Sequence, residues 1–269
     1  VQRRRVASPI PISSSRSIRG FVGRRMAANA ENYIKTFDID RYTRMVEEKT
    51  HRDWWWVGEQ LGKWLESAFL NAVWMRDEDL LQNAETILMR VADAQEPSGY
   101  VGITDPAVRT SQQPLRGMDA YELYFLLHAL CTTYEERRSY RSLKTARRLG
   151  DYFVDTIGPS KAEFWPSGLR PPQNEKAYVG GQSKIAGHGV HYSLEGTLLI
   201  DPMLRLYELT GDARYFEWSE WVIGSIDRWS GWQTFSRLDD VAAGLIGIDA
   251  VQPYVHAHTF HMNFLGFLR

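Results

Sequence analysis

The feature that most constrains the fold is a pair of helical patterns joined by a short turn. In residues 194–228, apolar side chains recur at steps of three or four residues, the spacing of a core-facing helix rather than a strand. Thr210-Gly211-Asp212 interrupts this spacing: Gly211 can take the left-handed conformation that ends a helix, and Asp212 can cap the next one. So short a connection makes two helices antiparallel, and the sequence predicts an αα-hairpin.

The same pattern occurs twice more, in residues 56–91 and 118–157, and each hairpin is followed by a long loop rich in Gly and Pro. A helical hairpin buries its apolar face by stacking on a neighbouring hairpin. Because each long loop follows the second helix of a hairpin, all the long loops lie at the same end of the stack. The pattern predicts an all-α fold, an α/α toroid that is incomplete in this chain. An open solenoid would give similar local patterns, but long loops of unequal length favour the toroid.

The chain divides into two predicted parts. Residues 1–14, with their prolines and serine run, are an extended lead-in, and residues 15–269 form one partial α/α-barrel domain. The sequence starts at Val1 rather than Met and stops at Arg269 inside an amphipathic pattern. We therefore expect a fragment whose domain is truncated at its C-terminal end.

Composition limits the classes of function. A net charge of −1 argues against nucleic acid or an anionic membrane as the main partner, and no apolar run approaches the roughly 20 residues of a membrane span. The aromatic share of 13% is high, which is typical of carbohydrate clefts and also of large helical cores. The single cysteine, Cys131, lies in an apolar run. This setting is typical of a small buried side chain and not of a catalytic thiol.

Four polar groups lie near the start of the first helix of a pair, at the end of the fold where the long loops are expected. They are Trp54–Trp56 with Glu59; Asp119, Tyr121 and Glu122; His188, His191 and Glu195; and His256, His258 and His261. Helix capping and loop packing are the structural alternatives for each group. Five of the seven histidines fall in the last two groups, and this clustering is the strongest chemical signal in the sequence.

Histidine and glutamate in such positions can bind zinc, but neither HxH nor HxxxE is a specific metal motif. No second carboxylate stands at ligand spacing, so we predict no metal site in this chain. Hydrogen bonding to sugar hydroxyls needs only neutral imidazoles and carboxylates in a cleft. A carbohydrate is therefore the predicted partner.

Five segments carry a resemblance to a known family. They are GEQLGKWLESA (58–68), AQEPSGYVG (94–102), AYELYFLLHAL (120–130), LYELTGDARYF (206–216) and HAHTFHMNFLGFLR (256–269). Together, and in this order, they resemble the β-L-arabinofuranosidase-like glycoside hydrolases, glycoside hydrolase family 127 and its relatives. The resemblance implies a catalytic (α/α)6 barrel that releases terminal arabinofuranose from plant-type glycans with retention.

The resemblance also implies roles for single residues. His258 matches a family histidine that contacts the sugar, and His191 lies near another. Tyr121 stands where characterised members have His in an HELY-like motif, a departure that bears on the exact substrate. The predicted substrate-binding residues are Trp56, Tyr121, Glu122, His191, Glu195 and His258.

The family's nucleophile is a cysteine held on zinc by further cysteines and a glutamate, and the resemblance implies that it lies beyond residue 269. Zinc is accordingly expected in the full-length parent, and the chain alone is expected to be inactive. Two alternatives remain: another α/α-toroid enzyme, such as a polysaccharide lyase or unsaturated-uronyl hydrolase, and a non-enzymatic helical-repeat interaction module.

Overall fold

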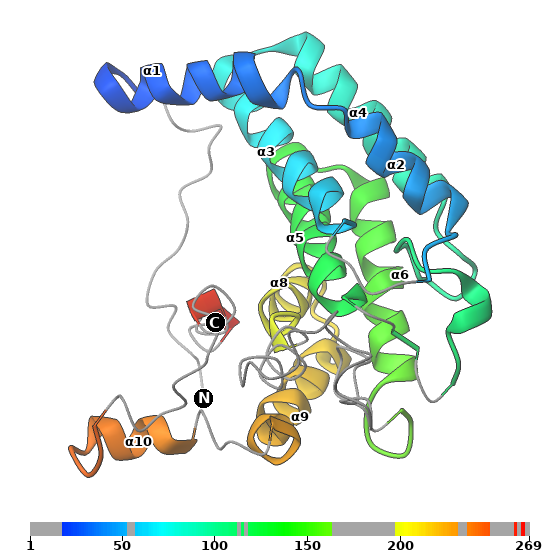
Figure 1. Ribbon diagram of the computed structural model, residues 1–269, viewed down its shortest axis with the longest axis vertical. Helices are drawn as coiled ribbons and strands as arrows, with labels where there is room; N and C mark the ends of the chain where they lie inside the picture. The colour runs from blue at the N-terminus through cyan, green and yellow to red at the C-terminus, as the bar shows by residue number, and fades with distance from the viewer. Residues whose placement is uncertain are drawn as a thin grey trace, which may run out of the picture. The chain divides into compact units, whose positions relative to one another are not determined.

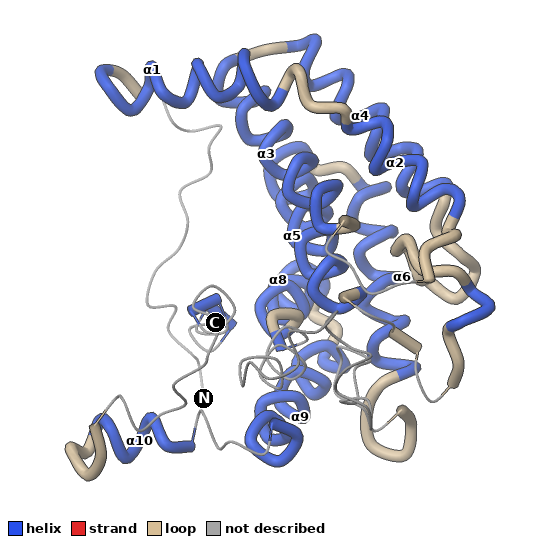
Figure 2. Tube along the Cα trace, viewed as in Figure 1, coloured by secondary structure: helices blue, strands red, loops and turns tan. Residues whose placement is uncertain are grey.

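The computed structural model describes helices throughout, and the predicted all-α class is confirmed (Figures 1 and 2). Among the described residues there is no strand and no helix long and apolar enough to cross a membrane. The described residues are 18–52, 57–111, 114–115, 118–162, 197–230, 236–247, 261–262 and 265–266. Contacts divide the chain into two compact units: Val1–His51, Trp56–Asp105 and Glu122–Tyr152 form one, and Arg52–Trp55, Pro106–Tyr121 and Phe153–Arg269 the other.

The first unit begins with three short helical segments: α1 (Gly20–Asn29), the π-helical turn η2 (Ala30–Ile34) and α2 (Ile39–Glu48). The Asp38 side chain caps α2 by accepting a hydrogen bond from the backbone N–H of Arg41 at 3.3 Å. Helix α2 packs on the hairpin that follows it, as Figure 1 shows.

That hairpin consists of α3 (Glu59–Met75) and α4 (Glu78–Asp93), which pack on each other. Arg76 ends α3 in the left-handed conformation, with a φ of 58°. Asp77 then caps α4 by accepting from the backbone N–H of Leu80 at 3.0 Å. These two adjacent residues make the tight turn, and the predicted hairpin is confirmed.

The second predicted hairpin consists of α5 (Asp119–Arg137) and α6 (Tyr140–Thr156). The Ser142 hydroxyl donates to the carbonyl of Leu130 at 2.7 Å and joins the two helices. Helix α5 also lies directly against α3, because a Cβ atom built on Gly62 would be 2.4 Å from the backbone nitrogen of Leu126. Glycine at this position allows the two helix backbones to approach this closely.

The second unit contains the third predicted hairpin, formed by α8 (Ile200–Thr210) and α9 (Ala213–Ser230), together with the short helices η3 (Pro106–Val108) and α10 (Ser236–Ala242). Gly211 ends α8 with a φ of 73°, and Asp212 Oδ1 accepts from the backbone N–H of Arg214 at 3.1 Å. Both predicted roles at this turn are confirmed. The Trp218 indole N–H donates to the carbonyl of Ile157 at 3.0 Å and fixes α9 within this unit.

Candidate functional site

Two of the six predicted substrate-binding residues, Tyr121 and Glu122, lie in the part of the chain that the structure describes. They are consecutive in the first turn of α5 and are 7% and 6% exposed. The other four, Trp56, His191, Glu195 and His258, lie outside the described residues.

Glu122 has a defined partner within the first unit. Its Oε1 accepts a hydrogen bond from the backbone N–H of Gly58 at 2.8 Å. Gly58 is the N-cap residue of α3 and has no side chain with which to cap it. Glu122 therefore places a carboxylate at the start of α3, where the free N–H groups and the helix dipole stabilise negative charge.

A second carboxylate belongs to the same turn of α3. Glu59 is 9% exposed, and its Oε2 lies 3.0 Å from the ammonium of Lys63. That ammonium also lies 4.4 Å from the ring centroid of Phe125 on α5, close enough for a cation–π interaction. The start of α3 thus gathers two carboxylates and one cation, groups that can hydrogen-bond the hydroxyls of a sugar.

A half-buried polar cluster farther along α3 and α5 was not predicted from the sequence. Glu66 Oε1 accepts from the Thr132 hydroxyl at 2.6 Å and lies 3.3 Å from His128 Nδ1. The available signal was His128, a polar residue inside the apolar run of α5. The cluster satisfies polar groups between two helices, and we assign it a structural role.

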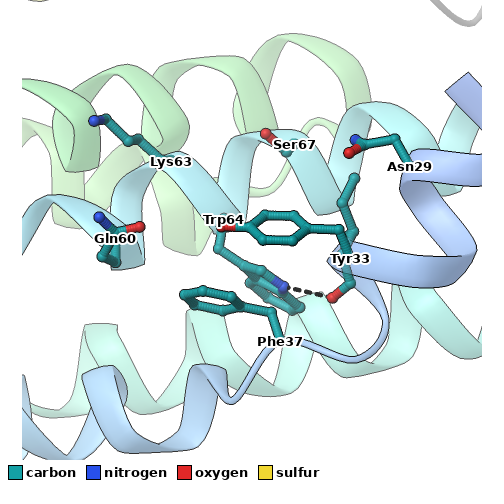
Figure 3. Close-up of a pocket in the computed structure, with 8 residues that line it drawn as sticks. Asn29, Tyr33, Phe37, Gln60, Lys63, Trp64 and Ser67 are labelled. Atoms are coloured by element: carbon teal, nitrogen blue, oxygen red, sulfur yellow. Dashed lines mark hydrogen bonds between the residues drawn. The ribbon is translucent and has the colours of Figure 1, made fainter. Parts of the chain in front are cut away.

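An aromatic pocket of about 200 Å³ was also missed. It lies where α1 and η2 meet α3, and Figure 3 shows three rings, from Tyr33, Phe37 and Trp64, with polar side chains around them. Tyr33 and Phe37 are four residues apart, a spacing that brings side chains together on a helical turn, and this was the signal in the sequence.

The described residues do not fit a zinc centre. No group of three His, Cys, Asp or Glu side chains in this part of the chain could hold a metal ion. The single cysteine, Cys131, is fully buried in α5.

Comparison with known proteins identifies the family. Residues 12–167 match the family model of the β-L-arabinofuranosidase GH127 catalytic domain. This match covers more than half of the 269 residues, and the chain belongs to that family. The predicted family resemblance is confirmed.

Two solved structures are similar to the chain at low identity. One is a GH127 β-L-arabinofuranosidase from Geobacillus stearothermophilus T6, with 18% identity and a TM-score of 0.49 over 74% of this chain and 29% of that one. The other is a GH127 β-arabinofuranosidase with 16% identity and a TM-score of 0.48; the match covers 81% of this chain and 43% of that one. The chain thus spans less than half the length of either protein. No curated protein matches it.

Proposed function

We propose that the chain is the N-terminal part of the catalytic domain of a glycoside hydrolase that releases terminal arabinofuranose from plant-type glycans. The observation that carries this proposal is the match of residues 12–167 to the GH127 catalytic domain. The matched range includes all of helices α1 to α6, and with them both described site residues. In the proposed parent, the helical hairpins form part of an (α/α)6 toroid.

The proposed role of this chain is to bind and orient the sugar. Glu122 is fixed by its hydrogen bond to Gly58, so its carboxylate has a defined position at the start of α3. A carboxylate held in this way can accept hydrogen bonds from sugar hydroxyls with little loss of side-chain entropy. Trp56, Tyr121, His191, Glu195 and His258 are proposed to complete the sugar site.

The proposed nucleophile is a zinc-held cysteine contributed by sequence outside these residues. Zinc, where bound by that cysteine, would lower the pKa of the thiol and so supply a thiolate nucleophile, the kind of nucleophile that a retaining mechanism needs. Cys131 is not the proposed nucleophile, because a fully buried thiol in the middle of α5 cannot reach a substrate.

The competing enzyme class is an α/α-toroid polysaccharide lyase or unsaturated-uronyl hydrolase, which acts on acidic sugars without zinc. A competing non-enzymatic function is a helical-repeat interaction module. The charged groups at the start of α3 favour an enzyme over such a module, since an interaction face is mostly apolar at its centre.

The test is a substrate panel with the parent protein. We expect hydrolysis of an aryl β-L-arabinofuranoside, a β-configured first product by NMR, and loss of activity on chelation of zinc. Activity that survives chelation and requires an uronic acid would assign the protein to the competing enzyme class. Absence of turnover on every glycoside, with binding of a protein partner instead, would favour the interaction module.

A further inference from the structure

The aromatic pocket is built on an irregular turn in the backbone. The backbone N–H of Lys35 donates to the carbonyl of Ala30 at 3.0 Å, a spacing of five residues that defines the π-helical turn η2. Single π-turns inside helices are rare and are frequent at functional sites. The turn carries Tyr33, which lines the pocket and remains 55% exposed.

The aromatic walls are held in place by contacts of their own. The indole N–H of Trp64 donates to the carbonyl of Ile34 at 2.8 Å, and Trp64 is 5% exposed (Figure 3). The Phe37 ring lies 5.5 Å from the Tyr33 ring and stacks on Tyr42 at 5.4 Å. The three lining rings are therefore preorganised, and binding of a ligand would lose little conformational entropy in ordering them.

The polar side chains of the pocket are mainly neutral. Asn29, Gln60 and Ser67 offer amide and hydroxyl groups, which both donate and accept hydrogen bonds. Among the described residues that line the pocket, Lys63 alone is charged, and its ammonium is paired with Glu59 at 3.0 Å. No carboxylate is present among the lining residues that the structure describes. This combination suits a neutral, hydroxylated ligand better than an anion or a metal ion.

The size of the pocket restricts the ligand further. Cavities of about 150 Å³ hold one benzene molecule. The volume of about 200 Å³ therefore admits one five- or six-membered ring with its substituents. Aromatic side chains present flat apolar faces that pack against the C–H face of such a ring, while the surrounding amides and hydroxyls bond its edge.

We infer that this pocket binds a single sugar ring of a neutral carbohydrate, with the ring against Tyr33 and Phe37 and its hydroxyls toward Gln60, Ser67 and Asn29. The inference of a neutral sugar stands on the pocket itself. The expectation that the sugar is an arabinofuranose rests on the proposed function.

The experiment is an NMR titration of the full chain that follows the indole N–H of Trp64. This signal is assigned by its loss in Trp64→Phe, and it reports on the pocket because its acceptor is the carbonyl of Ile34. The probes are methyl β-L-arabinofuranoside, methyl β-D-xylopyranoside and, as an acidic control, methyl glucuronide. A neutral sugar is expected to shift the Trp64 signal to saturation, and the glucuronide is expected to bind more weakly.

Variants separate binding from folding. Tyr33→Ala is expected to raise the Kd about tenfold, the effect of losing one ring contact of roughly 1.4 kcal/mol. Gln60→Ala leaves every ring in place and is expected to raise the Kd about threefold, the effect of one neutral hydrogen bond. Tyr140→Ala, at an exposed tyrosine that does not line the pocket, is the matched control and is expected to bind as the wild type.

The possible results of the titration lead to different conclusions. A Trp64 signal that no neutral sugar moves, or a Kd unchanged in Tyr33→Ala, overturns the inference and leaves the proposed function standing. A response to the xyloside without a response to the arabinofuranoside supports the pocket and counts against arabinofuranose as the sugar.

Discussion

Glu122 caps helix α3 from a different helix: its Oε1 accepts the backbone N–H of Gly58 at 2.8 Å, across 64 residues of sequence. The bond fixes a buried carboxylate of α5 at the start of α3. A Cβ atom on residue 58 would lie 2.2 Å from Glu122 Oε2, so glycine at this N-cap makes room for the acid. The local fold and the proposed sugar site thus depend on the same two residues.

The first prediction separates the hydrogen bond of Glu122 from its charge. Glu122→Ala removes the acceptor of the Gly58 N–H and is expected to lower the free energy of unfolding by about 1–3 kcal/mol. Glu122→Gln keeps an oxygen acceptor and is expected to lower it by less than about 1 kcal/mol. Denaturant unfolding of both variants measures the difference. Equal losses would contradict the capping role.

The second prediction concerns the contact of α3 with α5. Gly62→Ala places a Cβ atom 2.4 Å from the backbone of Phe125 and Leu126, and we expect it to cost about 1–3 kcal/mol or more through overpacking. Gly224→Ala in α9 is the matched control, because among the described residues a Cβ atom there meets nothing within 4 Å beyond its own helix backbone. It is expected to stabilise the protein by about 0.5–1 kcal/mol. If Gly62→Ala left the free energy of unfolding unchanged, the backbones of α3 and α5 would have to lie farther apart than the structure shows.

The third prediction concerns acid stability. The hydrogen bond from the Lys35 ammonium, followed by that from the backbone N–H of Leu80, holds the pKa of Asp77 below its usual value. A carboxyl with a lowered folded pKa contributes stability that is complete above its unfolded pKa of about 3.9 and is lost as the pH falls through the folded value. Stability is therefore expected to fall on acidification below about pH 4.

Two substitutions test the role of Asp77. Asp77→Asn keeps an oxygen that can accept from Leu80 but cannot ionise, so thermal melts should show a shallower loss of stability in acid. Asp77→Ala removes the cap as well and is expected to cost about 0.5–2 kcal/mol at neutral pH. An acid slope in Asp77→Asn as steep as in the wild type would show that other carboxyls dominate, such as Glu47, whose pKa is lowered by Arg90.

Much of the helical fold could be predicted from the sequence, because its signals are local. Apolar spacing identifies the hairpins, and the chemistry of Gly211 and Asp212 defines the turn between α8 and α9. The π-turn η2 has no such signal. Whether residue 35 bonds to Ala30 or to Glu31 depends on packing against α3, which a local pattern does not contain.

The candidate site was less predictable, because it depends on contacts between distant residues. The sequence places Glu122 in a polar group near a helix start, but nothing in the sequence identifies a glycine 64 residues earlier as its hydrogen-bond partner. The spacing of Trp64 in the sequence likewise predicts only a core residue. In the structure its indole N–H donates to the carbonyl of Ile34, and its ring forms part of the pocket wall. Side-chain pairing across helices is set by their packing, which periodicity alone does not specify.

The central claim is that this family member hydrolyses arabinofuranosides with a sugar site that includes Glu122. Its most direct test is kcat/KM for p-nitrophenyl β-L-arabinofuranoside, measured with the parent protein and with its Glu122→Gln variant. We predict that the wild type hydrolyses the substrate and that Glu122→Gln lowers kcat/KM at least about tenfold, the loss of one charged hydrogen bond to the substrate, at nearly unchanged melting temperature. A wild type that leaves the substrate intact, or a variant as active as the wild type, would contradict the claim.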